Sequence, residues 1–165
     1  MSIAPCEIPG GSFLEGHRLA GAYTDCYSTD IARAVSQAGY VEAFYTTPLF
    51  RLERVILGVV VKRPSTDADA RALATGASDA FAAWHVENRS ERELLVAAGR
   101  TRSWLMAAPS GSGTRLFFGS AIVPAIDPRT GKGSLGAAFH GLLGFHKLYS
   151  RALLRAARSR LERGA

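Results

Sequence analysis

The sequence has few cysteines and no long apolar run, and each shortage excludes a class of protein. Its two cysteines, Cys6 and Cys26, are too few for a disulfide-rich scaffold and cannot form a structural zinc site unaided. The longest apolar run, Val55 to Val61, has seven residues, whereas a membrane-spanning helix needs about 18 or more. The N-terminus has neither the basic start nor the apolar stretch of a secretion signal, so we expect no transmembrane segment and a cytoplasmic protein.

Sequence motifs for common cofactors and nucleophiles are also missing. The glycine-rich segments at 110–113 and 131–134 do not have the spacing of a phosphate-binding loop, and no G-x-S-x-G motif occurs. The histidines do not have the spacing of a metal-binding pair; they are His17, His85, His140 and His146. The sequence therefore predicts no metal site and no cofactor.

Positive charge is concentrated near the C-terminus. The chain carries a formal net charge of +6, and six basic residues but only one acidic residue lie between Lys147 and Ala165. Cations in the last turns of a helix are stabilised by the helix dipole, and they keep an outer helix face soluble. We therefore expect a solvated basic face and no specific nucleic-acid binding, while an anionic protein or membrane surface stays open as a partner.

Length and composition are typical of one globular domain. The 165 residues are 47% hydrophobic and 21% charged, which is too apolar for a disordered chain. A chain of this length buries enough surface to fold without disulfide or metal cross-links. We therefore expect residues 1–165 to form a single domain, in which residues 1–12 are an extended lead-in.

Strand and helix patterns alternate in the first half of the chain. Capping residues at 28–30 precede one helical pattern, and a threonine before Pro48 is typical of the N-terminus of another. The predicted elements are a strand at 22–28, a helix at 31–35, a helix from Pro48 to about Val60 and a short helix at 67–75. Residues 55–61 are rich in β-branched side chains and could equally form a strand.

The pattern changes to alternation of period two in the second half. Four strands are predicted, at 80–88, 92–98, 101–108 and 114–123. Because the turns between them are short, neighbouring strands must run antiparallel in a meander. A loop at 127–136 then leads to an amphipathic helix from Ala137 to about Arg163, which at about 38 Å can cross a whole sheet.

The order of a strand, two helices, an antiparallel meander and a long final helix resembles the helix-grip fold of the START and Bet v 1-like superfamily. The segments TTPLFRLERVILG, DAFAAWHVENR, RTRSWL, RLFFGSAIVP and FHGLLGFHKLYSRALLRAARSRL are similar to a bacterial domain family placed in that superfamily. The resemblance covers roughly residues 20–163. It implies an α+β fold, in which a curved antiparallel β-sheet wraps around the C-terminal α-helix and two or three shorter helices follow the first strand. It also implies a cavity between sheet and helix, where superfamily members such as lipid binders and polyketide cyclases hold apolar molecules.

Three polar residues are candidates for chemistry in such a cavity. His146 lies within the apolar arc of the final helix, where it is either a core histidine or an acid/base group. Arg102 alternates with Trp104 and Met106, which predicts a guanidinium in the cavity or at its rim. Asp25 lies inside a predicted strand and either pairs with a cation or acts as a base. None of the three is assigned as catalytic.

The sequence favours a binding protein for an apolar or amphipathic small molecule over an enzyme. The predicted ligand-binding residues are Trp84, Arg102, Trp104, Phe118, His146 and Tyr149. Two other functions stay open. One is a cyclase, dehydratase or isomerase in the same cavity, which requires the polar candidates to converge. The other is an interaction module that binds a protein or a membrane surface through the basic final helix. A homodimer is also left open.

Overall fold

The computed structural model describes residues 2–52, 54, 64–126, 128–131, 133–135 and 137–164. In the range 137–164, side chains are described from residue 144 onward. The question whether residues 55–61 form a helix or a strand lies outside the described residues.

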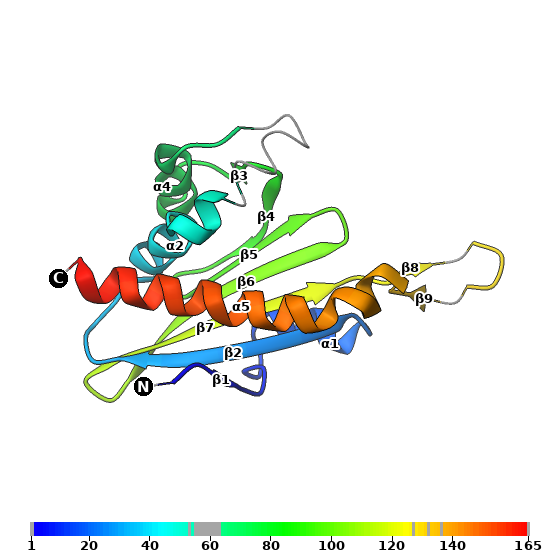
Figure 1. Ribbon diagram of the computed structural model, residues 1–165, viewed down its shortest axis with the longest axis horizontal. Helices are drawn as coiled ribbons and strands as arrows, with labels where there is room; N and C mark the ends of the chain where they lie inside the picture. The colour runs from blue at the N-terminus through cyan, green and yellow to red at the C-terminus, as the bar shows by residue number, and fades with distance from the viewer. Residues whose placement is uncertain are drawn as a thin grey trace.

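Within these ranges, seven strands form one antiparallel sheet (Figure 1). They are β1 (Ala4–Pro5), β2 (Tyr23–Ile31), β3 (Ala80–Phe81), β4 (Trp84–Arg89), β5 (Glu93–Ala98), β6 (Thr101–Ser110) and β7 (Gly113–Ile122). Their order is β1-β2-β7-β6-β5-β4-β3, so β3 to β7 form the predicted meander and β2 adds to its far edge. Two short strands, β8 (Ala125–Ile126) and β9 (Gly133–Ser134), pair separately.

Helices cover both faces of the sheet. The described helices are α1 (Phe13–Leu19), α2 (Gln37–Tyr45), α4 (Asp67–Thr75) and α5 (Ala137–Arg163), and residues 48–52 are also helical. Figure 1 shows α5 lying along the sheet, where it contacts β2, β7 and α2. The short helix α1 contacts β2, β5 and β7 as well. Leu14 of α1 belongs to the same cluster as Cys26, whereas Leu153 of α5 clusters with Tyr27. Because consecutive strand residues point to opposite faces, α1 and α5 lie on opposite faces of the sheet.

Two hydrophobic clusters correspond to the two faces. The face toward α2 and α5 carries the larger one, which includes Tyr27, Leu105 and Phe118. The face toward α1 carries the smaller one, formed by Leu14, Cys26, Leu95, Trp104 and Ala121. The sheet is therefore buried on both sides along its central strands, and large apolar residues are needed on both.

The predicted α+β helix-grip fold is confirmed, and some element boundaries are corrected. Residues 67–75 form α4, which begins with a capping box between Thr66 and Asp69 and ends at Gly76 with φ +81°. The helix predicted at 31–35 is wrong, because Ile31 ends β2 and α2 begins only after the cap at Ser36. The helix α1, directly after the lead-in, was not predicted.

Candidate functional site

A pocket of about 130 Å³ lies between the sheet and α5. Five aromatic residues contribute to its wall: Phe44, Phe50, Trp84, Phe118 and Tyr149. They come from α2, the helical segment at 48–52, β4, β7 and α5, so the wall depends on the whole fold. Leu153 and several hydroxyl side chains complete the lining, together with His146. The pocket is mostly apolar with a few polar groups, which is typical of small-molecule sites.

Two of the polar lining residues, Ser120 and His146, form a cluster with a third side chain, that of Asp25. Asp25 on β2 and Ser120 on β7 are register partners, and His146 reaches them from α5. The Ser120 hydroxyl donates to Asp25 Oδ1 at 2.6 Å, and the Ser120 N–H donates to the same oxygen at 3.2 Å. His146 Nε2 lies 2.8 Å from Ser120 Oγ and 3.2 Å from Asp25 Oδ2. The convergence of Asp25 and His146, which the enzyme hypothesis required, is therefore present.

The geometry of the cluster differs from that of an activated serine. In a nucleophilic triad the two nitrogens of the histidine face different partners, one the serine and the other the carboxylate. Here the single atom Nε2 faces both Ser120 and Asp25. Because the Ser120 proton is directed to Asp25, its oxygen is free to accept one from His146. A carboxylate and an imidazole therefore meet at one hydroxyl group next to the pocket.

The carboxylate of Asp25 is almost completely buried. The Asp25 side chain is 8% exposed, whereas that of His146 is 26% exposed. Within the described residues Asp25 Oδ2 accepts no hydrogen bond, and His146 Nε2 of α5 lies 3.2 Å from it. Burial, reinforced by the charge of Asp25, also raises the pKa of nearby Tyr23 to about 12, which keeps that phenol neutral.

Arg102 borders the pocket and has a carboxylate partner within the protein. Arg102 is among the residues around the pocket, but its guanidinium is engaged by Glu87, with Nε 2.6 Å from Oε2. Glu87 in turn contacts His17 of α1 at 2.8 Å. The guanidinium therefore belongs to the α1 face, because β6 turns Arg102 and Trp104 to the same side. An arginine with a carboxylate partner does not need an anionic ligand.

The prediction that Trp104 borders the pocket is wrong. Trp104 is fully buried on the α1 face against Leu14, and its indole N–H donates to Glu93 Oε2 at 2.8 Å. Its register partner is Gly119, whereas Ser103 pairs with Ser120 and faces the pocket side. The prediction that Arg102 and Trp104 lie on the same face of β6 is therefore correct, but that face is turned toward α1 and not toward the pocket. The error arose because α1 covers the second face and gives large residues a core there too.

The other predicted residues lie where the sequence placed them. Trp84, Phe118, His146 and Tyr149 all line the pocket, although their role in binding stays a prediction. Sequence reasoning missed Phe44, Phe50 and the role of Ser120. The contact of Ser120 with Asp25 joins residues 95 positions apart in sequence, so no local pattern could have shown it.

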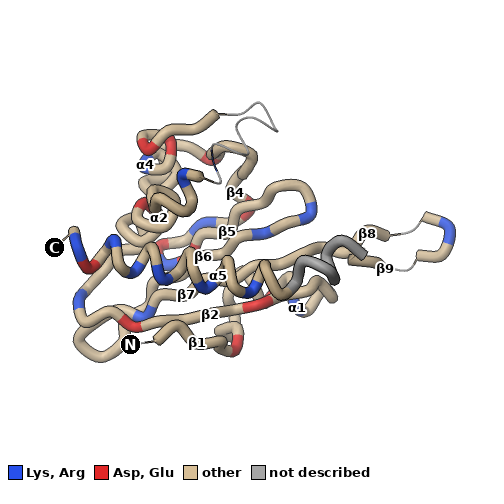
Figure 2. The backbone as a smooth tube through the Cα atoms, in the orientation of Figure 1, with Lys and Arg blue, Asp and Glu red and all other residues tan. Residues whose placement is uncertain are grey.

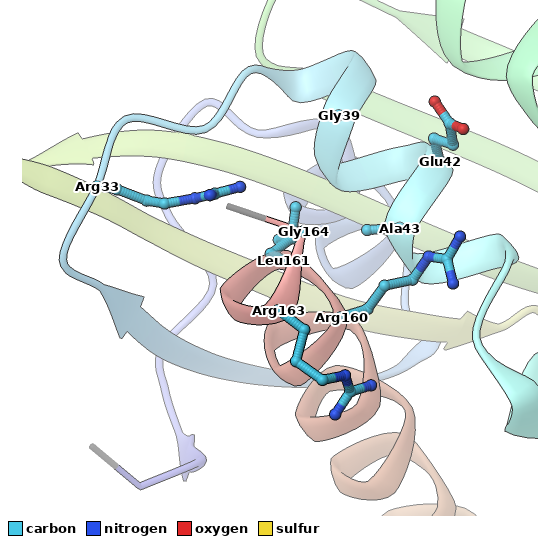
Figure 3. A pocket seen from close by; sticks show the side chains of 8 residues that line it. All are labelled: Arg33, Gly39, Glu42, Ala43, Arg160, Leu161, Arg163 and Gly164. Carbon is cyan, nitrogen blue, oxygen red and sulfur yellow. The ribbon is translucent and has the colours of Figure 1, made fainter.

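A second, wider pocket of about 400 Å³ lies where the C-terminal end of α5 meets α2. Its lining includes Arg33, Glu42, Arg160 and Arg163. In Figure 3 these arginine side chains point in different directions, and that of Arg163 points away from the other two. Arginines that diverge do not form a joint anion site, so we base the candidate site on the aromatic pocket.

Metal-ligating side chains do not gather elsewhere in the described part of the chain. Those residues contain no group of three or more His, Cys, Asp or Glu side chains that could hold a metal ion. The side chain of His140 lies outside the described residues. Among the described helices, none combines the length and apolar character needed to cross a membrane.

Comparisons with known proteins add little to this geometry. No family model matches the chain, and no curated protein matches it. A crystal structure of CalU16 from Micromonospora echinospora is similar at 14% sequence identity over 98% of this chain and 92% of that chain, with a TM-score of 0.32. Because that TM-score is low, the fold is assigned from the strand order and the position of α5 alone.

Proposed function

We propose that the protein binds a small, mostly apolar molecule in the pocket between the sheet and α5. The observation that carries this proposal is the composition of the lining, in which aromatic rings surround a space next to Ser120 and His146. Apolar walls supply binding free energy through burial, and a few polar groups fix the orientation of the ligand.

The volume limits the size of the ligand. At about 130 Å³ the space is close to that of an engineered cavity of roughly 150 Å³ that takes up benzene. It is smaller than the roughly 300–1,000 Å³ of pockets that enclose whole drug-sized ligands. We therefore expect a single ring, or the terminal ring of a larger molecule, to occupy it.

Polar side chains in the lining support a ligand that carries hydrogen-bonding groups. Ser103, Ser120, Ser150 and His146 border the pocket, and within the described residues Trp84 Nε1 is buried without a hydrogen-bond partner. Buried polar groups usually have partners, because each one left unpaired costs about 1–3 kcal/mol. A phenol or hydroxylated ring fits this combination of rings, donors and acceptors better than a plain hydrocarbon does.

Native mass spectrometry of the purified protein tests whether a ligand is present, and tryptophan fluorescence then tests where it binds. The chain has two tryptophans, of which Trp84 lines the pocket and Trp104 lies on the opposite face. In a Trp104→Phe variant, titration with a phenolic probe should quench the remaining Trp84 emission. In the matched Trp84→Phe variant, the same probe should leave Trp104 emission unchanged.

A third variant tests whether the space itself is used. Phe118→Trp should fill part of the pocket and weaken probe binding at least about tenfold while circular dichroism shows an intact fold. Equal quenching of Trp84 and Trp104, or unchanged affinity in the Phe118 variant, would contradict binding in this pocket.

Proton-transfer catalysis is a second candidate, favoured by the distance of 3.2 Å between His146 Nε2 and Asp25 Oδ2. A carboxylate and an imidazole in contact beside a pocket are the groups that general acid–base catalysis requires. The test is deuterium exchange of an acidic C–H of a bound ketone probe, followed by NMR in D2O. Exchange should be lost in both Asp25→Asn and His146→Gln; exchange that persists in both variants would leave binding as the function.

A further inference from the structure

Cys6 and Cys26 form a pair of free thiols that neither the pocket nor its chemistry uses. The two Sγ atoms lie 3.0 Å apart, and the Cys6 N–H donates to the Cys26 carbonyl oxygen at 3.0 Å. The pairing of Pro5 with Tyr27 in the β1–β2 ladder continues to these residues, so they are direct cross-strand neighbours. Cysteines on adjacent antiparallel positions have the Cα separation that a disulfide needs.

We propose that Cys6 and Cys26 are a reversible oxidation site, at which a peroxide converts the dithiol to an intramolecular disulfide that fastens the N-terminal segment to β2. The proposal is independent of the proposed ligand, because Cys26 faces α1 and not the pocket.

The thiols of Cys6 and Cys26 differ in exposure and in pKa. Cys6 is partly exposed, whereas Cys26 is 5% exposed and packs against the Leu14 and Trp104 cluster. A hydrogen bond from Cys26 lowers the pKa of Cys6 to about 7, against the effect of burial and with smaller help from Ser28 and Arg115. The same hydrogen bond, together with burial, raises the pKa of Cys26. Cys6 is thus the thiol that reacts with an oxidant, and Cys26 is the one that resolves the product.

The chemistry balances in two steps. The Cys6 thiolate attacks one oxygen of hydrogen peroxide, the O–O bond breaks, and hydroxide leaves as Cys6 becomes a sulfenic acid. The Cys26 sulfur then attacks Cys6 Sγ, the S–O bond breaks, and the Cys26 proton leaves with the hydroxyl group as water. Two thiols are oxidised and one peroxide is reduced to water. A small dithiol such as dithiothreitol reverses the change by exchange.

The structural consequence concerns α1. A bond between residues 6 and 26 closes a ring that contains the whole of α1, Phe13–Leu19, whose Leu14 fills the core on that face of the sheet. Closing this ring removes chain entropy from any state in which α1 separates from the sheet. Oxidation should therefore slow local opening of the N-terminal region in particular.

Intact-mass spectrometry and thiol counting test the oxidation. Reduced, desalted protein treated with a few equivalents of hydrogen peroxide should lose about 2 Da, the mass of two hydrogens, and dithiothreitol should restore the original mass. The number of titratable thiols in the unfolded protein should fall from two to none. Cys26→Ala should instead accumulate a Cys6 sulfenic acid that dimedone traps, and Cys6→Ser should react with peroxide at least about tenfold more slowly.

Two further readouts separate this site from incidental oxidation. The rate of alkylation of Cys6 should rise with a midpoint near pH 7 in the wild type, and this midpoint should move upward in Cys26→Ala, because the hydrogen bond that lowers the pKa is lost. Hydrogen exchange of the α1 amides should slow on oxidation, while that of α4 should stay unchanged.

Three results would overturn the proposal. They are an unchanged thiol count after peroxide treatment, oxidation of Cys6 beyond sulfenic acid without any disulfide, and a disulfide that links two chains on a non-reducing gel. Because none of these experiments uses a pocket ligand, their failure is distinct from failure of the proposed function.

Discussion

Substitution of Gly119 by alanine should destabilise the protein through a defined collision on the α1 face. Gly119 lies on β7 opposite Trp104, at the point where α1 rests on the sheet. An added Cβ would lie 2.8 Å from the Asp25 carbonyl oxygen and 3.1 Å from Trp104 Cε3, and closest of all to Leu14 Cδ2. The Leu14 side chain can move, but the carbonyl belongs to the neighbouring strand and cannot move without disturbing the ladder.

The size of the effect follows from the cost of overpacking a core, which is about 1–3 kcal/mol. For a chain of this length each kcal/mol changes the melting temperature by about 2–4 °C, so Gly119→Ala should lower it by roughly 2–12 °C. Thermal unfolding followed by far-UV circular dichroism measures this shift, and chemical denaturation measures the corresponding free energy of unfolding.

Gly16→Ala is the matched control within α1. A Cβ at Gly16 would meet nothing within 4 Å. Because alanine favours a helix over glycine by about 1 kcal/mol, this variant should be neutral or more stable. If Gly119→Ala is as stable as the wild type, the packing of α1 against β7 and Trp104 is wrong.

Three other substitutions or measurements examine the remaining surfaces. Leu153 lies on the buried face of α5 and is 4% exposed, so Leu153→Ala should cost about 2–5 kcal/mol of unfolding free energy. Arg155→Ala on the exposed face of the same helix should change it by less than roughly 0.5 kcal/mol, and equal effects would refute the assigned helix faces. Glu93→Ala should cost about 1–3 kcal/mol, because it leaves the buried Trp104 N–H and the Phe13 N–H without their acceptor, and near-UV circular dichroism should show the changed indole. Lys and Arg residues recur along α5 (Figure 2), and Lys147, Arg151 and Arg155 are exposed. Vesicles of anionic lipid should bind these residues weakly and release the protein near physiological salt, as light scattering or sedimentation would show. Retention at that salt, helped by the exposed Phe145 and Leu148, would favour the interaction-module function.

Local pattern was sufficient for the elements whose periodicity is long and uninterrupted. The final helix was expected from Ala137 to about Arg163, and α5 has these bounds. The strands predicted at 101–108 and 114–123 correspond to β6 and β7. In each of these, many residues repeat one spacing, so a single exception does not change the prediction.

Short elements and the choice of sheet face could not be predicted in the same way. The helix α1 has seven residues, and its only local signal is Ser12 followed three positions later by Glu15, a spacing typical of a helix start. Alternation shows that Arg102 and Trp104 share a face, but it does not show which face. That depends on whether another element covers the back of the sheet, and here the answer is set by α1.

The candidate site depends on register, which is a property of long-range pairing. Asp25 meets Ser120 because β2 pairs with β7 and sets Asp25 opposite Ser120. A shift of this register by one residue would place Arg115, Phe117 and Gly119 on the pocket face, and the polar cluster would not exist. No local sequence pattern fixes the pairing of Asp25 with Ser120 across 95 residues. The sequence therefore indicated Asp25 and His146 as candidates but not their contact.

The same alternation places two kinds of chemistry on consecutive residues of β2. Asp25 faces α5 and meets His146, whereas Cys26 faces α1 and meets Cys6. The strand that carries both residues, β2, pairs with β7 along its whole length, from Tyr23 to Ile31. A disulfide at Cys26 would therefore constrain the edge strand β1 and the helix behind the sheet, and a ligand beside Asp25 would contact only the opposite face. Because Asp25 and Cys26 point to opposite faces of the sheet, the proposed ligand pocket and the proposed thiol pair can be tested separately, each with variants that do not touch the other.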